Sequence, residues 1–161
     1  MTTTLAPTLE DKVRAAVAAV DDPEYPGVSV VDLGLLEAVW VADDGAVEVN
    51  LVPTFSGCPA LGIIADEVRS VVAAVDGVDA GRIDVRWLGT PVWTVDRISE
   101  VGREAMAREF TVAVRIGSEP VACPRCGAET TEDSLFGPSR CRAVHLCPSC
   151  AEVVEVMRSG G

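Results

Sequence analysis

Histidine is almost absent from this chain, with His145 as the one example in 161 residues. A cysteine or serine nucleophile is often activated by a neighbouring histidine, so this scarcity weakens the hypothesis of a nucleophilic enzyme. The chain also has no run of eighteen apolar residues, and its N-terminus lacks the charged-then-apolar pattern of a signal peptide. We therefore expect a cytoplasmic protein that does not span a membrane.

Basic residues are few as well: 13 Lys and Arg stand against 25 Asp and Glu, a net charge of −12. Such a field repels phosphate backbones and argues against nucleic-acid binding. We expect proteins, metals or clusters as partners. Six cysteines in a cytoplasmic chain bind metal or react more often than they form disulfides.

Periodicity divides the chain into two units, residues 8–110 and 122–161, joined by a linker at 111–121 that contains Gly117 and Pro120. The first unit has the order α-β-β-α-β-α, which predicts an α+β domain with helices on one face of a small sheet. Thr8 is expected to cap the first helix, and Asp43-Asp44-Gly45 to turn a β-hairpin. The expected helices and strands are 9–20, 36–41, 47–52, 59–75, 82–88 and a last helix that Thr94 or Ser99 caps and that ends near Phe110.

The stretch Pro53-Thr54-Phe55-Ser56-Gly57-Cys58-Pro59 joins the second strand to the second helix. Pro59 fits the first helical position, which would place Cys58 at or next to the N-cap. Free backbone N–H groups there favour the thiolate, so we expect a lowered pKa for Cys58. The alternative from this stretch alone is a small buried apolar cysteine.

Two Cys-x-x-Cys pairs in the second unit are the most specific signal in the chain. Cys123 and Cys126 form the first pair, Cys147 and Cys150 the second, with twenty residues between the pairs. Four thiolates at this spacing predict a tetrahedral structural zinc site in a zinc ribbon. A single rubredoxin-like iron is the alternative, although Phe136 is the only aromatic residue of this unit.

Two other residues of the second unit are expected to lie outside that metal site. Cys141 could approach the metal as a fifth thiol, but four ligands already fill a tetrahedron, so we expect it to pack in the core. His145 is expected to pack or to donate hydrogen bonds rather than to bind the metal.

Taken in order, five motifs resemble the PaaD family of phenylacetate-degradation proteins. The resemblance covers roughly residues 20 to 150, and the chain departs from the family pattern at Arg97, at His145 and in the tail 153–161. The motifs are Asp22-Pro23-Glu24, Val31-Asp32-Leu33-Gly34, the Pro53–Pro59 stretch, Pro91-Val92-Trp93-Thr94-Val95-Asp96, and residues 136–147.

This resemblance implies an iron–sulfur-assembly domain of the SufT and MIP18-like kind followed by a four-cysteine zinc ribbon. It implies a non-catalytic accessory of the multicomponent phenylacetyl-CoA epoxidase, working with the epoxidase components and the iron–sulfur assembly machinery. Cys58 and Glu24 match the family's motif positions and would be the working pair, holding iron or a cluster transiently. Asp22, Asp32 and Thr54 are the further candidates.

Three hypotheses about function remain open. In a maturation factor, the single Cys58 thiolate would hold iron or a cluster and release it, and a homodimer could share a cluster between two such thiolates. A cysteine-nucleophile enzyme would need the ribbon to bring His145 to Cys58. A zinc-ribbon adaptor without metal transfer would leave the Pro53–Pro59 stretch as scaffold.

Overall fold

The structure, a computed structural model, describes residues 6–159, so the start of the N-terminal tail and the last two residues of the expected ribbon unit lie outside it. Among the described residues, no helix combines the length and the apolar composition needed to cross a membrane. The helices are α1 (Leu9–Val17), α2 (Leu61–Ala73), α3 (Glu100–Phe110) and the short 3-10 helix η1 (Val95–Arg97). The strands are β1 (Asp21–Asp22), β2 (Tyr25–Ser29), β3 (Leu36–Val41), β4 (Val47–Leu51), β5 (Ile83–Trp87), β6 (Val112–Val114), β7 (Thr131–Ser134), β8 (Arg142–Leu146) and β9 (Val153–Met157).

Helix α1 begins as its sequence predicts. The Thr8 side chain accepts the Asp11 backbone N–H at 3.1 Å, and the Asp11 carboxylate accepts the Thr8 N–H at 2.9 Å. This reciprocal pair satisfies donors that the helix leaves free at its N-terminus. The helix ends at Val17 rather than Val20, and it is followed by a hairpin of β1 and β2 that is absent from the expected strands. Glu24 lies in the turn of this hairpin.

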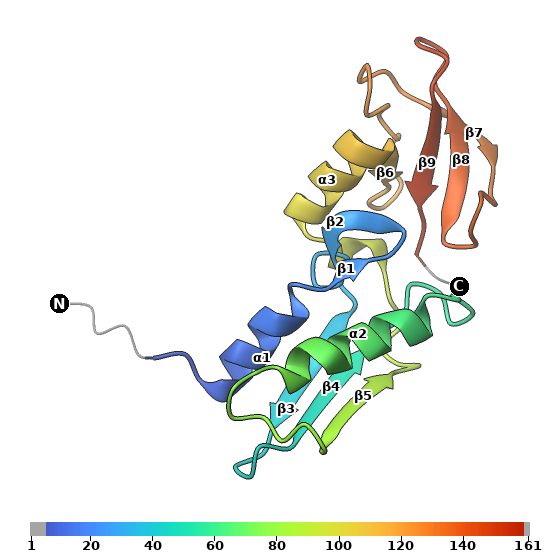
Figure 1. Ribbon diagram of the computed structural model, residues 1–161. Helices are drawn as coiled ribbons and strands as arrows, with labels where there is room; N and C mark the ends of the chain where they lie inside the picture. Colours follow the sequence, from blue (N-terminus) through green and yellow to red (C-terminus); the bar gives the residue numbers. More distant parts are fainter. Residues whose placement is uncertain (1–5, 160–161) are drawn as a thin grey trace.

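Strands β3, β4 and β5 form the sheet of the first domain (Figure 1). The turn at Gly45 joins β3 and β4 as an antiparallel hairpin, as predicted, whereas β4 and β5 run parallel with α2 as the crossover. Helices α1 and α2 contact each other, and they contact β3 and β5 respectively. They cover one face of the sheet and bury side chains such as Val49 and Ile64 between the layers.

Helix α3 packs elsewhere, against β2 and β6. Asp32 holds its start, because the Asp32 carbonyl accepts the Ser99 N–H at 2.8 Å and its carboxylate accepts the Ser99 hydroxyl at 2.6 Å. The turn that carries Asp32 ends at Gly34, whose φ is +75°, and a Cβ there would overlap the carbonyl oxygen of Arg97. The Val31–Gly34 motif thus places α3 on the first domain.

The C-terminal sheet has the strand order β6-β9-β8-β7. Strand β6 lies inside residues 111–121, which we expected to be a linker, and it pairs in parallel with β9. That expectation is wrong for residues 112–114. Three residues carry too little periodicity to reveal a strand, and their partner is some forty residues away in the sequence.

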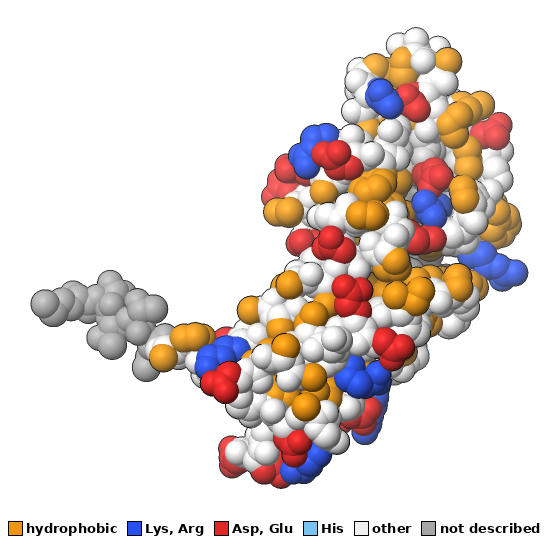
Figure 2. Space-filling view, in the orientation of Figure 1, with side chains coloured by type: hydrophobic (Ala, Val, Ile, Leu, Met, Phe, Trp, Pro, Cys, Tyr) orange, Lys and Arg blue, Asp and Glu red, His pale blue; other side chains and the backbone are white. Residues whose placement is uncertain are grey.

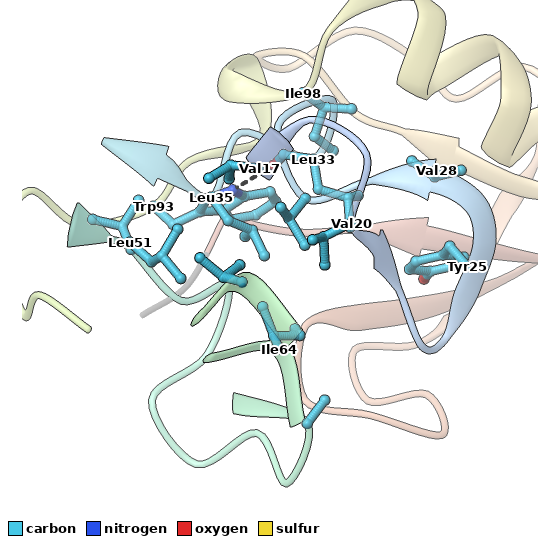
Figure 3. Packing of buried hydrophobic residues seen from close by; sticks show 14 of the residues in the cluster. Val17, Val20, Tyr25, Val28, Leu33, Leu35, Leu51, Ile64, Trp93 and Ile98 are labelled. Carbon is cyan, nitrogen blue, oxygen red and sulfur yellow. Dashed lines mark hydrogen bonds between the residues drawn. The ribbon is translucent and has the colours of Figure 1, made fainter. Parts of the chain in front are cut away.

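The two domains share a core. Met157 from β9 and Cys141 before β8 belong to the same buried cluster as Tyr25, Leu33 and Ile64 of the first domain. Figure 3 shows Tyr25 and Val28 on β2 at one end of this cluster and Leu51 and Trp93 at the other. The β1–β2 hairpin lies between the two sheets in Figure 1 and contacts the ribbon. The ribbon is therefore seated on the first domain.

Candidate functional site

Cys58 lies in a pair of tight turns before α2. Its N–H donates to the Phe55 carbonyl at 3.1 Å, and its own carbonyl accepts the Leu61 N–H at 3.3 Å. The helix begins at Leu61 with Ala60 as the N-cap, so Pro59 is not the first helical residue and Cys58 lies two residues before the cap. The predicted helix start is wrong because the two successive turns take up residues 55–61.

The surroundings of Cys58 also overturn the expected lowering of its pKa. Partial burial raises the pKa of Cys58, and the negative charges of Glu24, Asp22 and Cys141 raise it further. Only the backbone N–H of Ala60 favours the thiolate. The sequence indicated the nearby helix and the opposing acids Glu24 and Asp32, but not the partial burial, Asp22 or the Cys141 thiol that decide the direction. These surroundings therefore favour the protonated form of the Cys58 thiol.

Two of the predicted acids accompany Cys58. The Asp22 carboxylate accepts the Glu24 N–H at 2.8 Å, which shapes the β1–β2 turn, and burial raises the pKa of Asp22. Glu24 is partly exposed and lies 3.5 Å from the guanidinium of Arg142 in β8. Arg142 also lies 5.5 Å from the centre of the Tyr25 ring. The site thus combines a thiol, two carboxylates and one guanidinium.

Asp32 and Thr54 have other surroundings. The Asp32 carboxylate accepts hydrogen bonds from the hydroxyl groups of Ser29 and Ser99. These bonds give Asp32 a structural role at the start of α3. Thr54 lines a hollow of about 320 Å³ between the cysteine loop and residues 87–93. Their part in metal transfer stays a prediction, and these contacts do not add to it.

The acids around Cys58 predict a measurable change in its reactivity. Glu24→Gln removes a negative charge, so the pKa of Cys58 should fall and its alkylation at neutral pH should become faster. Iodoacetamide labelling of the Cys58 peptide, followed by mass spectrometry across pH, gives the apparent pKa. In the parent protein we expect a value above that of a free thiol. Glu67→Gln, on the exposed face of α2, makes the same charge change and should leave the alkylation rate of Cys58 unaltered. If Glu67→Gln accelerated alkylation as much as Glu24→Gln does, the effect of Glu24 would not be local.

The second candidate site is the four-cysteine centre of the ribbon. The sulfur atoms of Cys123, Cys126, Cys147 and Cys150 all lie within 4.8 Å of one another. The Cys123 and Cys150 sulfurs are 3.7 Å apart, and those of Cys126 and Cys147 are 3.5 Å apart. A tetrahedron with Zn–S bonds of about 2.3 Å requires about 3.8 Å between sulfurs, so these residues fit a bound metal.

The second knuckle favours one thiolate, at Cys147, while the neighbouring cysteine sulfurs raise the pKa of Cys150. Backbone N–H groups of Cys150 and Ser149 lower the pKa of Cys147 to about 7. Strands β8 and β9 flank the second pair, and an isolated bridge between Ala122 and Glu129 closes the first. Metal binding requires deprotonated sulfur, so these amides prepare the centre for a cation.

His145 packs away from the metal, as predicted. It is buried, and its Nδ1 lies 2.9 Å from the Thr130 hydroxyl. Thr130 also donates to the Val121 carbonyl at 2.9 Å, so Thr130 accepts from Nδ1–H. The His145 ring therefore ties β8 to the loop that carries the first knuckle.

Cys141 packs in a core, but in the core of the first domain rather than beside the ribbon centre. It is buried in the cluster against which Cys58 packs, and its charge acts on Cys58. Sequence reasoning missed this neighbour of Cys58. Its place before Cys147 indicated only a ribbon residue, and no local pattern connects it to residue 58.

Residues 10–85 match the family described as "Iron-sulfur cluster assembly protein", and residues 108–158 match the "PaaD zinc beta ribbon domain". An Escherichia coli K12 protein, provisionally named as one of the subunits of 1,2-phenylacetyl-CoA epoxidase, is 31% identical over 96% of each chain. The chain belongs to the PaaD family.

The first domain of this PaaD-family chain also resembles shorter proteins. The Fe-S protein maturation auxiliary factor YitW of Bacillus subtilis is 34% identical over 61% of this chain and 93% of its own length. The auxiliary factor SufT of Staphylococcus aureus is 34% identical over 54% of this chain and 96% of its own length. A Bacillus anthracis domain of unknown function, DUF59, has a solved structure that superposes with a TM-score of 0.57 at 32% identity, covering 61% of this chain and 91% of that domain.

Proposed function

We propose that this PaaD-family chain is an accessory maturation factor that passes iron or an iron–sulfur cluster to an oxygenase of the phenylacetyl-CoA epoxidase kind. Cys58 is the transfer ligand, and Glu24 assists as an oxygen ligand or proton acceptor, with Asp22 beside it. The ribbon metal is structural zinc. The relatives named as Fe-S maturation factors and as part of an epoxidase support this function.

The position of Cys58 carries the proposal. Its thiol lies in a loop that is fixed by two backbone turns and surrounded by carboxylates. Thiolate is the donor that iron–sulfur species prefer, and carboxylate oxygens suit iron ions. The neighbouring carboxylates repel a thiolate at Cys58 and so keep the thiol protonated. A bound cation would neutralise that repulsion, and the same negative charges would attract the cation.

The expected partners follow from this function. The donor is the iron–sulfur assembly machinery and the acceptors are the epoxidase components, all in the cytoplasm. A homodimer that shares a cluster between two Cys58 thiolates is one arrangement of the carrier. A nucleophilic enzyme is disfavoured, because His145 is buried in the ribbon and its Nδ1 is bonded to Thr130.

Co-expression tests the function directly. The epoxidase components are purified without oxygen after co-expression with the parent protein, with Cys58→Ser, or with no accessory. Iron and sulfide in the clients are then measured. We expect Cys58→Ser to lower client metal to the level without accessory, because a hydroxyl is a far poorer ligand for iron–sulfur species. Glu24→Gln should cause a smaller loss.

Ser56→Ala, an exposed change in the same loop, is the matched control and should leave client metal unchanged. Client metal that is equal with parent and Cys58→Ser protein would exclude Cys58 as the transfer ligand. It would favour a zinc-ribbon adaptor without metal transfer.

A further inference from the structure

A cavity of about 440 Å³ lies between the two domains, apart from the Cys58 loop. Residues 94–96 of the first domain line one side, and strands β7, β8 and β9 with residues 115–117 line the rest. None of the described lining residues belongs to the Pro53–Pro59 stretch. A cavity of this volume is in the range that small molecules occupy in proteins. Its aliphatic lining residues are Val95, Ile116, Leu135, Ala143, Val156 and Met157.

His145 contributes an unpaired acceptor to this cavity. The residue is 4% exposed, and its Nδ1 is bonded to Thr130, which donates its own hydroxyl proton to the Val121 carbonyl. In the neutral ring Nδ1 therefore carries the hydrogen and Nε2 carries a lone pair. Within residues 6–159, Nε2 has no hydrogen-bond partner. A buried acceptor without a partner is costly, so a ligand that donates a hydrogen bond here gains free energy.

Glu132 places a second acceptor beside this nitrogen. The two residues are direct partners across β7 and β8, and the Glu132 Oε2 lies 3.8 Å from the His145 Nε2. This distance is too long for a hydrogen bond between them, but a group with several protons can donate to both atoms. An ammonium group has three, and the carboxylate charge favours it over a neutral donor. A water could also bridge them, but its share of liquid volume is about 30 Å³, far less than this cavity.

The other charged groups of the lining are two guanidinium groups, from Arg115 and Arg158, and the carboxylate of Asp96. Arg158 is oriented by the Leu135 carbonyl, to which it donates, and by the Phe136 ring, whose centre is 5.2 Å away. A ligand that carried only a positive charge would be repelled by both arginines. A ligand with an ammonium group and a carboxylate matches charges of both signs.

We propose that this cavity binds a small aliphatic amino-carboxylate. Its ammonium group donates to the His145 Nε2 and to Glu132, and its carboxylate faces Arg115 and Arg158. The aliphatic part packs against side chains such as Val95, so the ligand contacts both domains and stabilises their junction. This site is separate from Cys58, and the proposal does not depend on metal transfer.

Labelled histidine tests the site directly, because His145 is the single histidine of the chain. The full chain, with zinc in the ribbon and no histidine tag, is observed by ¹⁵N NMR of the ring while L-leucine is added. We expect the proton on Nδ1 in the free protein, and an Nε2 signal that moves toward that of a hydrogen-bonded nitrogen. N-acetyl-L-leucine lacks the ammonium group and isoamylamine lacks the carboxylate, so each should bind at least about 10-fold more weakly than L-leucine.

Two variants remove the acceptors one at a time. Glu132→Gln should weaken L-leucine binding at least about 10-fold, because it removes a charged hydrogen-bond acceptor. Asp133→Asn, an exposed neighbour on β7 outside the cavity lining, makes the same charge change and should bind like the parent. His145→Asn removes Nε2 but keeps a side-chain donor for Thr130, and it should abolish binding while the ribbon retains zinc.

Three results would overturn the proposal. The first is a free ring with its proton on Nε2, and the second is an Nε2 signal that does not respond to L-leucine. The third is binding of either single-charge probe, or of L-leucine to Glu132→Gln, that equals binding of L-leucine to the parent.

Discussion

Removing the metal from the four-cysteine centre should unfold the C-terminal sheet while β3, β4, β5 and α2 stay folded. In the part of the chain that the structure describes, the ribbon's own core consists of six buried residues, and two of them, Cys123 and Cys147, belong to the four-cysteine centre. So small a core cannot offset the entropy of ordering its strands. Structural zinc supplies about 10 kcal/mol or more in small zinc peptides, so its loss should remove most of the ribbon's stability.

Cys126→Ser is the sharpest variant, because the Cys126 side chain is exposed and the change disturbs little besides ligation. Hydrogen exchange should show lost protection in β7, β8 and β9, and nearly unchanged protection in the first sheet. Arg125→Ala, beside the same knuckle, should keep both zinc and protection. Protection that persists in the metal-free ribbon would contradict the argument. Elemental analysis that finds iron in place of zinc would overturn the identity of the metal.

The same experiment reports on the junction between the domains. Cys141 and Met157 pack against the first domain, and Arg142 contacts Glu24 and Tyr25. If the ribbon unfolds, these contacts open and Cys58 loses part of its cover. Alkylation of Cys58 should therefore become faster when the metal is removed.

Local signals in the sequence gave correct predictions where local physics decides the structure. The Thr8 capping box and the hairpin turn at Gly45 depend on residues within a few positions of each other. Cys123, Cys126, Cys147 and Cys150 converge because each knuckle is short and the ribbon strands bring the two knuckles together. The family's motifs supplied the α+β domain and the ribbon in the right order.

The features that sequence reasoning missed are made by contacts between distant residues. Strand β6 exists because β9, about forty residues later in the chain, pairs with it. The pKa of Cys58 depends on burial and on charges from β1–β2 and from Cys141. A local argument from the α2 terminus therefore gave the wrong direction for the pKa shift of Cys58.

Figure 2 shows acidic side chains over both lobes of this face, in keeping with the net charge.

Trp93→Ala should be the most damaging single change in the first domain. Trp93 is 1% exposed, and its indole N–H donates to the Leu33 carbonyl at 2.8 Å (Figure 3). Truncating a buried tryptophan costs about 3–5 kcal/mol. The orphaned Leu33 carbonyl adds about 1–3 kcal/mol, because buried acceptors without a partner are costly. The sum is comparable to the whole stability of a small domain, so we expect a largely unfolded protein at 25 °C.

Trp93→Phe separates the two terms, since phenylalanine keeps much of the apolar volume but cannot donate to Leu33. Measured by urea denaturation, the free energy of unfolding should therefore fall less in Trp93→Phe than in Trp93→Ala. The decrease should include the cost of the lost hydrogen bond, about 1–3 kcal/mol. Trp40→Ala is the matched control. Trp40 is 65% exposed on β3, so this substitution should change the free energy of unfolding by no more than about 1 kcal/mol. If Trp93→Ala were as mild as Trp40→Ala, then the Pro91–Asp96 motif would not hold the Leu33 turn in place. Its presence in the sequence would then need a reason outside the core, such as the hollow that Trp93 and Thr54 both line.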